Sequence, residues 1–426
     1  MAEVELKQES QDSKYNGLAN NNEELDLPTL ADDNTDKEDN KENKQEAKAA
    51  KKLFKENPLA FLDNAKDYKD MTDFNLADYI VKAAAYSGGS GKFLQNAKDY
   101  QGINGLDLAG TIHSAADINP QAFLENAQDY KGIFENKRLA GEIRLALEKA
   151  PGTFLENYGN YKDILNEEQM IDCISRCATV DARTFLYLIP SYITMEPKWF
   201  IEGLKQAGKL DPNTLLRENI LAEIDKFKSL ITNENDPKAI VDTIDEIIGN
   251  NLVAFLNNLT RNLKGNGCYL ENVIGTEKLY KNLSEGADKF PDLFLQIKNL
   301  DKFRFPLDST REDESGKIHY FNMLEKIENA AEQKPKVFLN NIRRNYEGGT
   351  GGTKEHTFIF QKLLQGSFLQ TIELAIKKEP SYFLANIADS KEWNTGIINY
   401  NANEKEQSFN PSQFKKVAQD ALDGMK

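Results

Sequence analysis

Residue types that carry out catalysis or bind metals are scarce in this sequence. The 426 residues include three cysteines and three histidines, too few cysteines for a disulfide scaffold of this length. The histidines are isolated, so no Ser/His/Asp or Cys/His arrangement is indicated. Cys173 and Cys177 share a helix face but have no third or fourth zinc ligand nearby, so we expect two small buried side chains. We therefore predict no metal site, no cofactor and no catalytic residues.

Long apolar runs and basic clusters are also absent. No stretch approaches the ~20 apolar residues of a membrane span, and the first residues lack the basic-then-apolar pattern of a secretory signal. We therefore expect a cytoplasmic protein without membrane insertion. The 53 Lys and Arg are outnumbered by 68 Asp and Glu, a net charge of −15, which argues against nucleic acid because phosphate binding needs a dense basic face.

The acidic charge is concentrated at the N-terminus. Residues 1–50 hold 14 acids and 6 lysines, a net charge of −8, with one aromatic residue and no Ile or Phe. Such a segment cannot bury enough apolar surface to offset the entropy of ordering it, so we predict a disordered acidic tail. Its one apolar cluster, Leu25–Leu30, is either part of a solvating tail or a linear motif that docks on a partner.

The rest of the chain repeats itself. A pattern of the form Pro-x-x-Phe-Leu-x-Asn-Ala-x-Asp-Tyr returns with spacings of 32, 30, 31 and 31 residues between its anchor phenylalanines, which are Phe61, Phe93, Phe123, Phe154 and Phe185. Eight of the thirteen prolines stand three residues before a phenylalanine. Proline suits the first position of a helix, and Asn57, Asn119 and Asn410 are suitable N-caps. Each motif therefore predicts a helix whose fourth residue faces the core.

A second helix follows each early motif after a turn, as in Leu76–Ile80 and Leu108–Ile112, where apolar residues recur with helical spacing. A unit of about 31 residues cannot bury its apolar face alone, so neighbouring units must stack. No β segment is apparent. We predict an all-α, right-handed solenoid of stacked helix-turn-helix units. In period and pattern residues 53–424 resemble HEAT-like and other α-solenoids, without the marker residues of the tetratricopeptide, ankyrin or pentatricopeptide families.

We divide the chain into a tail (1–50), regular repeats (51–195), divergent helical pairs (196–264) and repeats with inserted loops (265–426). In the divergent part we expect a long helix from Pro212 to about Ile231, and this part could also be a joint between two halves. The anchor spacing lengthens to 39, 44 and 45 residues after Phe255. The insertions include Asp308–Gly316 and Glu347–Thr353, and insertions in solenoids often map to the binding face.

An asparagine follows seven of the anchors by three residues, and these asparagines form the candidate site. Asparagine is a weak helix former, so its recurrence predicts either a buried amide that satisfies backbone groups or a ladder that grips an extended peptide, as in armadillo-type solenoids. We favour the structural alternative. The members of this asparagine ladder are Asn64, Asn96, Asn126, Asn157, Asn258, Asn341 and Asn386.

A tyrosine stands seven residues after each of the first five anchors and eight residues after Phe338, and we expect its ring in the core and its hydroxyl in water. The series comprises Tyr68, Tyr100, Tyr130, Tyr161, Tyr192 and Tyr346. The glycine-rich Gly88–Lys92 lacks the residues of a phosphate loop, and we interpret it as a loop between helices.

These features favour a non-catalytic scaffold or adaptor that binds a protein or peptide partner along the repeat surface. The alternatives are a structural subunit of a larger assembly, such as a phage or cell-envelope particle, and an enzyme with a site grafted onto the repeats. The oligomeric state is left open.

Overall fold

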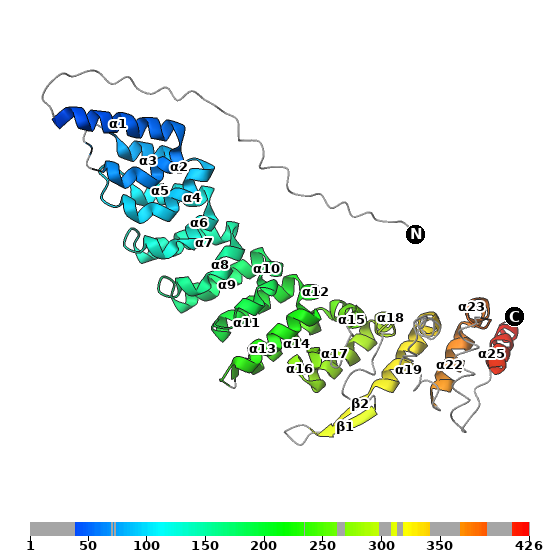
Figure 1. Ribbon diagram of the computed structural model, residues 1–426. Coiled ribbons are helices and arrows are strands. Elements are labelled where there is room, and N and C mark those ends of the chain that lie inside the picture. Colours follow the sequence, from blue (N-terminus) through cyan, green and yellow to red (C-terminus); the bar gives the residue numbers. More distant parts are fainter. Residues whose placement is uncertain are drawn as a thin grey trace, which may run out of the picture.

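The computed structural model describes residues 39–69, 71, 74–233, 235–261, 269–297, 308–312, 318–340, 367–389 and 411–425. Figure 1 shows that these residues form an elongated row of helices from α1 to α25. The sequence features Leu25–Leu30, Asn341, Tyr346, Glu347–Thr353 and Asn410 lie outside the described residues.

Most helices fall into two parallel rows. The first row consists of α2 (Pro58–Asn64), α4 (Ser87–Asn96), α6 (Pro120–Glu125), α8 (Pro151–Glu156), α10 (Ala182–Tyr187), α12 (Pro212–Leu215), α15 (Leu252–Arg261), α18 (Pro291–Phe294) and α23 (Pro380–Asn386). The second row consists of α3 (Leu76–Ala84), α5 (Leu108–Ile118), α7 (Asn136–Lys149), α9 (Glu167–Val180), α11 (Pro197–Leu210), α14 (Asn235–Asn250), α17 (Thr276–Lys289), α19 (Met323–Gln333), α22 (Ser367–Lys378) and α25 (Pro411–Gly424).

Consecutive helices pack against each other within each row. Contacts run from α2 to α18 along the first row and from α3 to α25 along the second row. The buried apolar side chains form one continuous cluster between the rows. The packing continues through the divergent part, where α11 contacts both α9 before it and α14 after it.

Helices α2 and α6 begin as the sequence predicts. The side chains of Asn57 and Asn119 each accept a hydrogen bond from the amide three residues ahead, at 3.0 Å, and proline follows at the first helical position. Two motifs behave differently, because Pro197 and Pro411 open long second-row helices. The anchor of the sixth unit is instead Leu215, a fully buried leucine that a search for phenylalanine does not find.

The predicted two-helix unit contains a third segment. Helices α2, α4, α6 and α8 end at or just before their ladder asparagine, α10 ends before Leu188, and a short 3₁₀ helix follows each. The 3₁₀ segments are η1 (Ala65–Tyr68), η2 (Ala97–Tyr100), η3 (Ala127–Tyr130), η4 (Tyr158–Tyr161) and η5 (Ile189–Ser191). The change of helix type brings the tyrosine back onto its anchor, and the rings of Phe154 and Tyr161 stack with centroids 4.7 Å apart.

The tyrosine hydroxyls connect successive units. Tyr100 donates to the carbonyl of Leu62 at 2.9 Å, and Tyr130 and Tyr161 donate to the carbonyls of Leu94 (3.0 Å) and Leu124 (2.9 Å). Each acceptor lies in the last turn of the preceding first-row helix, where α-helical carbonyls lack a regular intrahelical partner. The expectation that these hydroxyls reach water is wrong. They are buried, and burial raises the pKa of all three phenols.

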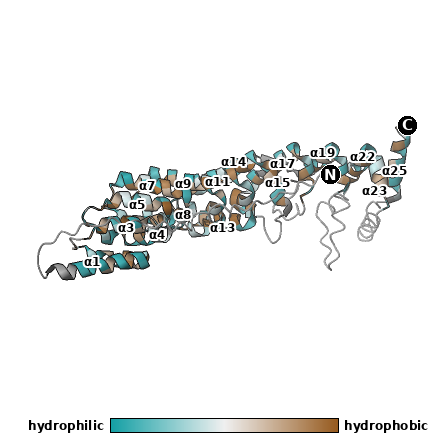
Figure 2. Cartoon of the chain, turned by 90° about the horizontal axis from the view of Figure 1, so that it is seen from above, coloured by the Kyte–Doolittle hydropathy of each residue, from teal (hydrophilic) through white to brown (hydrophobic). Residues whose placement is uncertain are grey.

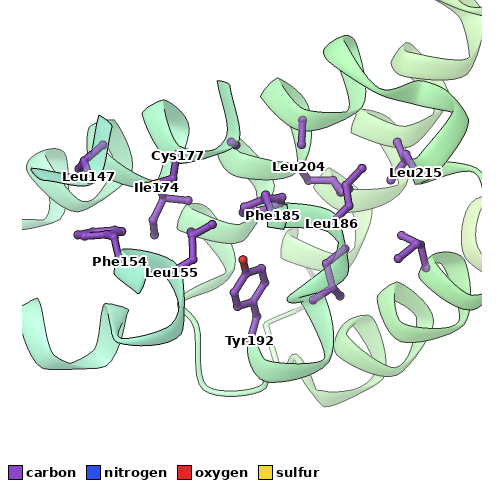
Figure 3. Close-up of a cluster of buried hydrophobic side chains, with 14 of the residues drawn as sticks. Leu147, Phe154, Leu155, Ile174, Cys177, Phe185, Leu186, Tyr192, Leu204 and Leu215 are labelled. Carbon is purple, nitrogen blue, oxygen red and sulfur yellow. The ribbon is translucent and has the colours of Figure 1, made fainter. Parts of the chain in front are cut away.

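The series of bonds is interrupted at Tyr192. Its hydroxyl is buried without a hydrogen-bond partner among the described residues, and Figure 3 shows it pointing into the apolar cluster that includes Leu155 and Phe185. Tyr158 stands where earlier units have alanine, and its ring packs edge-on against that of Tyr192 with centroids 6.1 Å apart. We attribute the missing bond to this larger side chain.

Two helices replace the 3₁₀ segments in the divergent part. Helix α13 (Glu218–Leu230) contacts η5, and α16 (Tyr269–Ile274) contacts α13. The predicted single helix from Pro212 to about Ile231 is therefore wrong. The chain forms the one-turn helix α12, leaves helical geometry before Arg217, and begins again at Glu218.

One inserted loop contains a β-hairpin, which the sequence analysis missed. Strand β1 (Asp308–Glu312) pairs antiparallel with β2 (Ile318–Asn322), with Asp308 opposite Asn322. Figure 1 shows the hairpin extending beyond the row of helices near α19. Five residues per strand are too short a pattern to stand out in a sequence dominated by helical periodicity. The other described elements are helical.

The predicted disordered tail is too long at its C-terminal end. Residues 39–50 belong to helix α1 (Asp39–Glu56), on which Ala47, Ala50 and Phe54 are buried. The Phe54 ring packs against Phe61 and Tyr79, with centroids 5.6 and 5.0 Å apart. The other residues of α1 are mostly hydrophilic (Figure 2), as expected of a helix that covers the first unit of a repeat array.

No helix within the described ranges is both long and apolar enough to cross a bilayer.

Replacing Tyr130 and Tyr192 by phenylalanine should give different results. Tyr130→Phe leaves the buried Leu94 carbonyl without this donor and should lower the free energy of unfolding by about 1–2 kcal/mol. Tyr192→Phe removes a hydroxyl that has no partner, so stability should stay unchanged or rise by up to about 1 kcal/mol. Urea titration followed by circular dichroism measures both. Equal losses in the two variants would contradict the assigned bonding.

Candidate functional site

The structure places most ladder asparagines at the ends of their own helices. Their side-chain nitrogens donate to the backbone carbonyl four residues earlier, at 2.7 to 3.0 Å. These pairs are Asn64 with Ala60, Asn126 with Ala122, Asn157 with Thr153, Asn258 with Ala254 and Asn386 with Tyr382. Asn96 instead donates to the Asp63 carboxylate of the preceding unit, at 3.2 Å.

This hydrogen bond has a local physical reason. The last carbonyls of a helix have few or long hydrogen bonds from the helix itself, and a side-chain amide at the junction with the 3₁₀ segment supplies an additional donor. Asn126 shows the pattern: its backbone N–H and its side-chain nitrogen both point to the carbonyl of Ala122, at 3.3 and 2.8 Å. The amide is then directed along its own helix.

Asn258 also lines an open groove between the first-row helices α12 and α15 and the helices α13 and α16. We call it the α12–α16 groove, with a volume of about 590 Å³. Its lining comes from α12, the start of α13, α15 and α16, and consists of Asn213, Arg217, Glu218, Asn219, Ala222, Asn258 and Tyr269.

The polar side chains of this groove are held by neighbours. The side-chain nitrogen of Asn258 lies 3.4 Å from the amide oxygen of Asn213. Arg217 precedes α13 without capping it, and its guanidinium donates to the Tyr187 hydroxyl at 2.8 Å. Of these lining residues, only Asn258 carries a recurring sequence signal. The other lining residues come from helices that break the repeat pattern, so no periodic signal marks them.

A second groove lies on the other side of α15, which we call the α14–α17 groove, with a volume of about 520 Å³. It shares Asn213 with the first groove and lies beside the ends of α14 and α17. Its asparagines are Asn213, Asn250, Asn251 and Asn257. The one lysine in its lining, Lys289, forms an ion pair with Glu285 at 2.6 Å.

The glycine-rich segment Gly88–Lys92 is helical, so its interpretation as a loop is wrong. It forms the first turns of α4. A Cβ at Gly89 would lie 1.9 Å from the carbonyl oxygen of Ala83. Glycine is therefore needed where the start of α4 crosses the end of α3, which accounts for this segment by packing rather than by phosphate binding.

The two cysteines of α9 are buried thiols. Burial raises the pKa of Cys173 to about 12 and that of Cys177 well above its usual value. His113 lies on α5 with its Nδ1 2.8 Å from a carboxylate oxygen of Glu142 on α7. In the part of the chain that the structure describes, no three His, Cys, Asp or Glu side chains are placed to hold a metal ion.

Comparison with protein-family models, with curated proteins and with solved structures finds no match for this chain.

Replacing a ladder asparagine outside the grooves should affect stability. Asn126→Ala removes a donor from the Ala122 carbonyl and should lower the free energy of unfolding by about 1 kcal/mol. Asn160, an exposed asparagine of η4, provides the control, and Asn160→Ala should change stability by less than about 0.5 kcal/mol. Thermal melts compare the two. An unchanged melting temperature for Asn126→Ala would contradict a structural role.

The α9 thiols should be unreactive in the folded protein. Because a raised pKa reduces the thiolate fraction and burial blocks access, iodoacetamide at pH 8 should label Cys173 and Cys177 only after unfolding. A Cys268→Ser variant leaves these two as the only thiols, and mass spectrometry counts the adducts. Rapid labelling without denaturant would show that α9 is accessible.

Proposed function

We propose that this protein is a non-catalytic scaffold, a right-handed α-solenoid of HEAT-like general shape, that binds a protein partner along its surface. The observation that carries the proposal is that successive units are joined in the same way. The same tyrosine-to-leucine bond links three successive pairs of units, and consecutive helices contact each other along both rows.

This construction supports a binding role. An array in which each unit contacts mainly its neighbours grows in one direction and offers a long surface for its size. Surface ion pairs also join neighbouring second-row helices, as between Arg144 and Asp172 at 2.9 Å and between Arg176 and Glu148 at 3.0 Å. Such exposed pairs add little stability, and they leave the outer surface polar.

The two grooves beside α15 give this surface a local feature. They combine asparagine amides with few charges, a composition that suits a polypeptide better than a phosphate backbone, which calls for several cations. The net charge of the helical part also argues against a phosphate backbone as the partner. Residues 51–426 carry a net charge of −7, which follows from −15 for the chain and −8 for residues 1–50.

The test is affinity purification from native lysate of the source organism, with the full chain as bait and a chain lacking residues 1–38 beside it. A scaffold should retain the same partner in both forms, at a defined stoichiometry, because the helical array is intact in each. Light scattering after size exclusion gives the mass of the isolated chain. Self-association into a large closed particle, without any other protein bound, would favour an assembly subunit and contradict the scaffold.

A further inference from the structure

The two grooves lie on either side of one helix and share one residue. Asn258 lines the α12–α16 groove, and Asn257 lines the α14–α17 groove. Consecutive residues of a helix point about 100° apart, so α15 presents one amide to each groove. Asn213 of α12 borders both grooves, which makes the two grooves neighbouring parts of one surface.

The charges of this surface nearly cancel. Arg217 and Glu218 line the first groove together, and Lys289 in the second groove is already paired with Glu285. What remains is mainly amide groups, each with an oxygen acceptor and two N–H donors. A peptide main chain offers one donor and one acceptor per residue, so asparagine amides match it without requiring charge on either side.

Several of these groups are oriented before any ligand binds. Asn258 donates to the Ala254 carbonyl at 2.9 Å, Asn251 donates to the Ile247 carbonyl at 2.9 Å, and Arg217 donates to the Tyr187 hydroxyl at 2.8 Å. Side chains that are already held lose less entropy on binding. The Asn251 bond uses its side-chain nitrogen.

Partly exposed apolar side chains lie in each groove. The side chain of Tyr269 is 39% exposed in the first groove, and that of Val253 is 42% exposed in the second. Apolar side chains of a bound chain can pack there while its backbone faces the amides. Sites for small molecules are enclosed and mostly apolar, whereas these grooves are open and rich in amides.

We propose that the α12–α16 and α14–α17 grooves form one site for an extended, uncharged stretch of a partner polypeptide. The amides of Asn213, Asn251 and Asn258 and the guanidinium of Arg217 bind its main chain, and Tyr269 and Val253 contact apolar side chains at either end. This inference rests on the proposed function, since the occupant is a segment of the protein partner.

The probe is a 12-residue peptide selected from a random displayed library on the full chain, synthesised with a fluorophore. Its Kd is measured by fluorescence polarisation against the full chain and its variants. Asn213→Ala should weaken binding about tenfold, because two hydrogen bonds to the main chain are worth about one decade in affinity. Asn160→Ala, with its exposed asparagine outside both grooves, should leave the Kd unchanged. Circular dichroism checks that each variant is folded.

Two further measurements test main-chain recognition. N-methylation of the central peptide amides should abolish binding, because it removes the main-chain donors. Raising the salt concentration from 0.05 to 0.5 M screens exposed charge interactions. Because the proposed site binds through uncharged amides, the Kd should change less than about twofold. The proposal is overturned if no peptide is selected, if the selected peptides are highly charged and released by salt, or if Asn213→Ala binds normally. It is also overturned if deleting residues 1–38 tightens binding, because the chain's own tail would then occupy the grooves.

This experiment can fail separately from the scaffold proposal. If the lysate partner is retained equally by the full chain and by Asn213→Ala, the scaffold remains and the grooves are not its site. If the library peptide binds in the grooves but no lysate protein is retained, the grooves accept a main chain and the scaffold proposal fails.

Discussion

The buried bond from a tyrosine hydroxyl to a leucine carbonyl is the constraint on which the regular part of this protein depends. It joins the side chain of one unit to the backbone of the unit before it, so the distance between units is set by a hydrogen bond as well as by apolar packing. The bond exists because the 3₁₀ segment folds the tyrosine back over its anchor phenylalanine. An unsatisfied group at that depth would cost stability, which keeps successive units in the same register.

The architecture changes where this bond is missing. Tyr158 replaces the small alanine of earlier units, the hydroxyl of Tyr192 has no partner in the described residues, and the next segment beside the first row is helix α13 rather than a 3₁₀ turn. The two grooves lie just beyond this point. The regular units form a uniform support, and the departure from regularity provides the surface to which we assign binding.

Prediction from the sequence succeeds where the cause is local. Proline at the first helical position and asparagine before it mark the starts of α2 and α6, because both effects act within one turn. The same signal also marks helix starts at Pro197 and Pro411, but these prolines open second-row helices, because the local signal does not determine whether the helix is short or long. The glycine at position 89 is required by the close approach of α3, a contact that no local pattern contains.

The candidate site divides in the same way. The helical pattern, its period and the recurring asparagines can be predicted from the sequence, since they follow from periodicity and from the backbone preferences of single residues. What each asparagine does depends on how the helices pack around it. Asn126 satisfies a carbonyl of its own helix, whereas Asn258 does so and also lines a groove with Asn213 and Arg217. The difference arises from which helices pack beside α15, and that depends on contacts between residues more than forty positions apart in the chain.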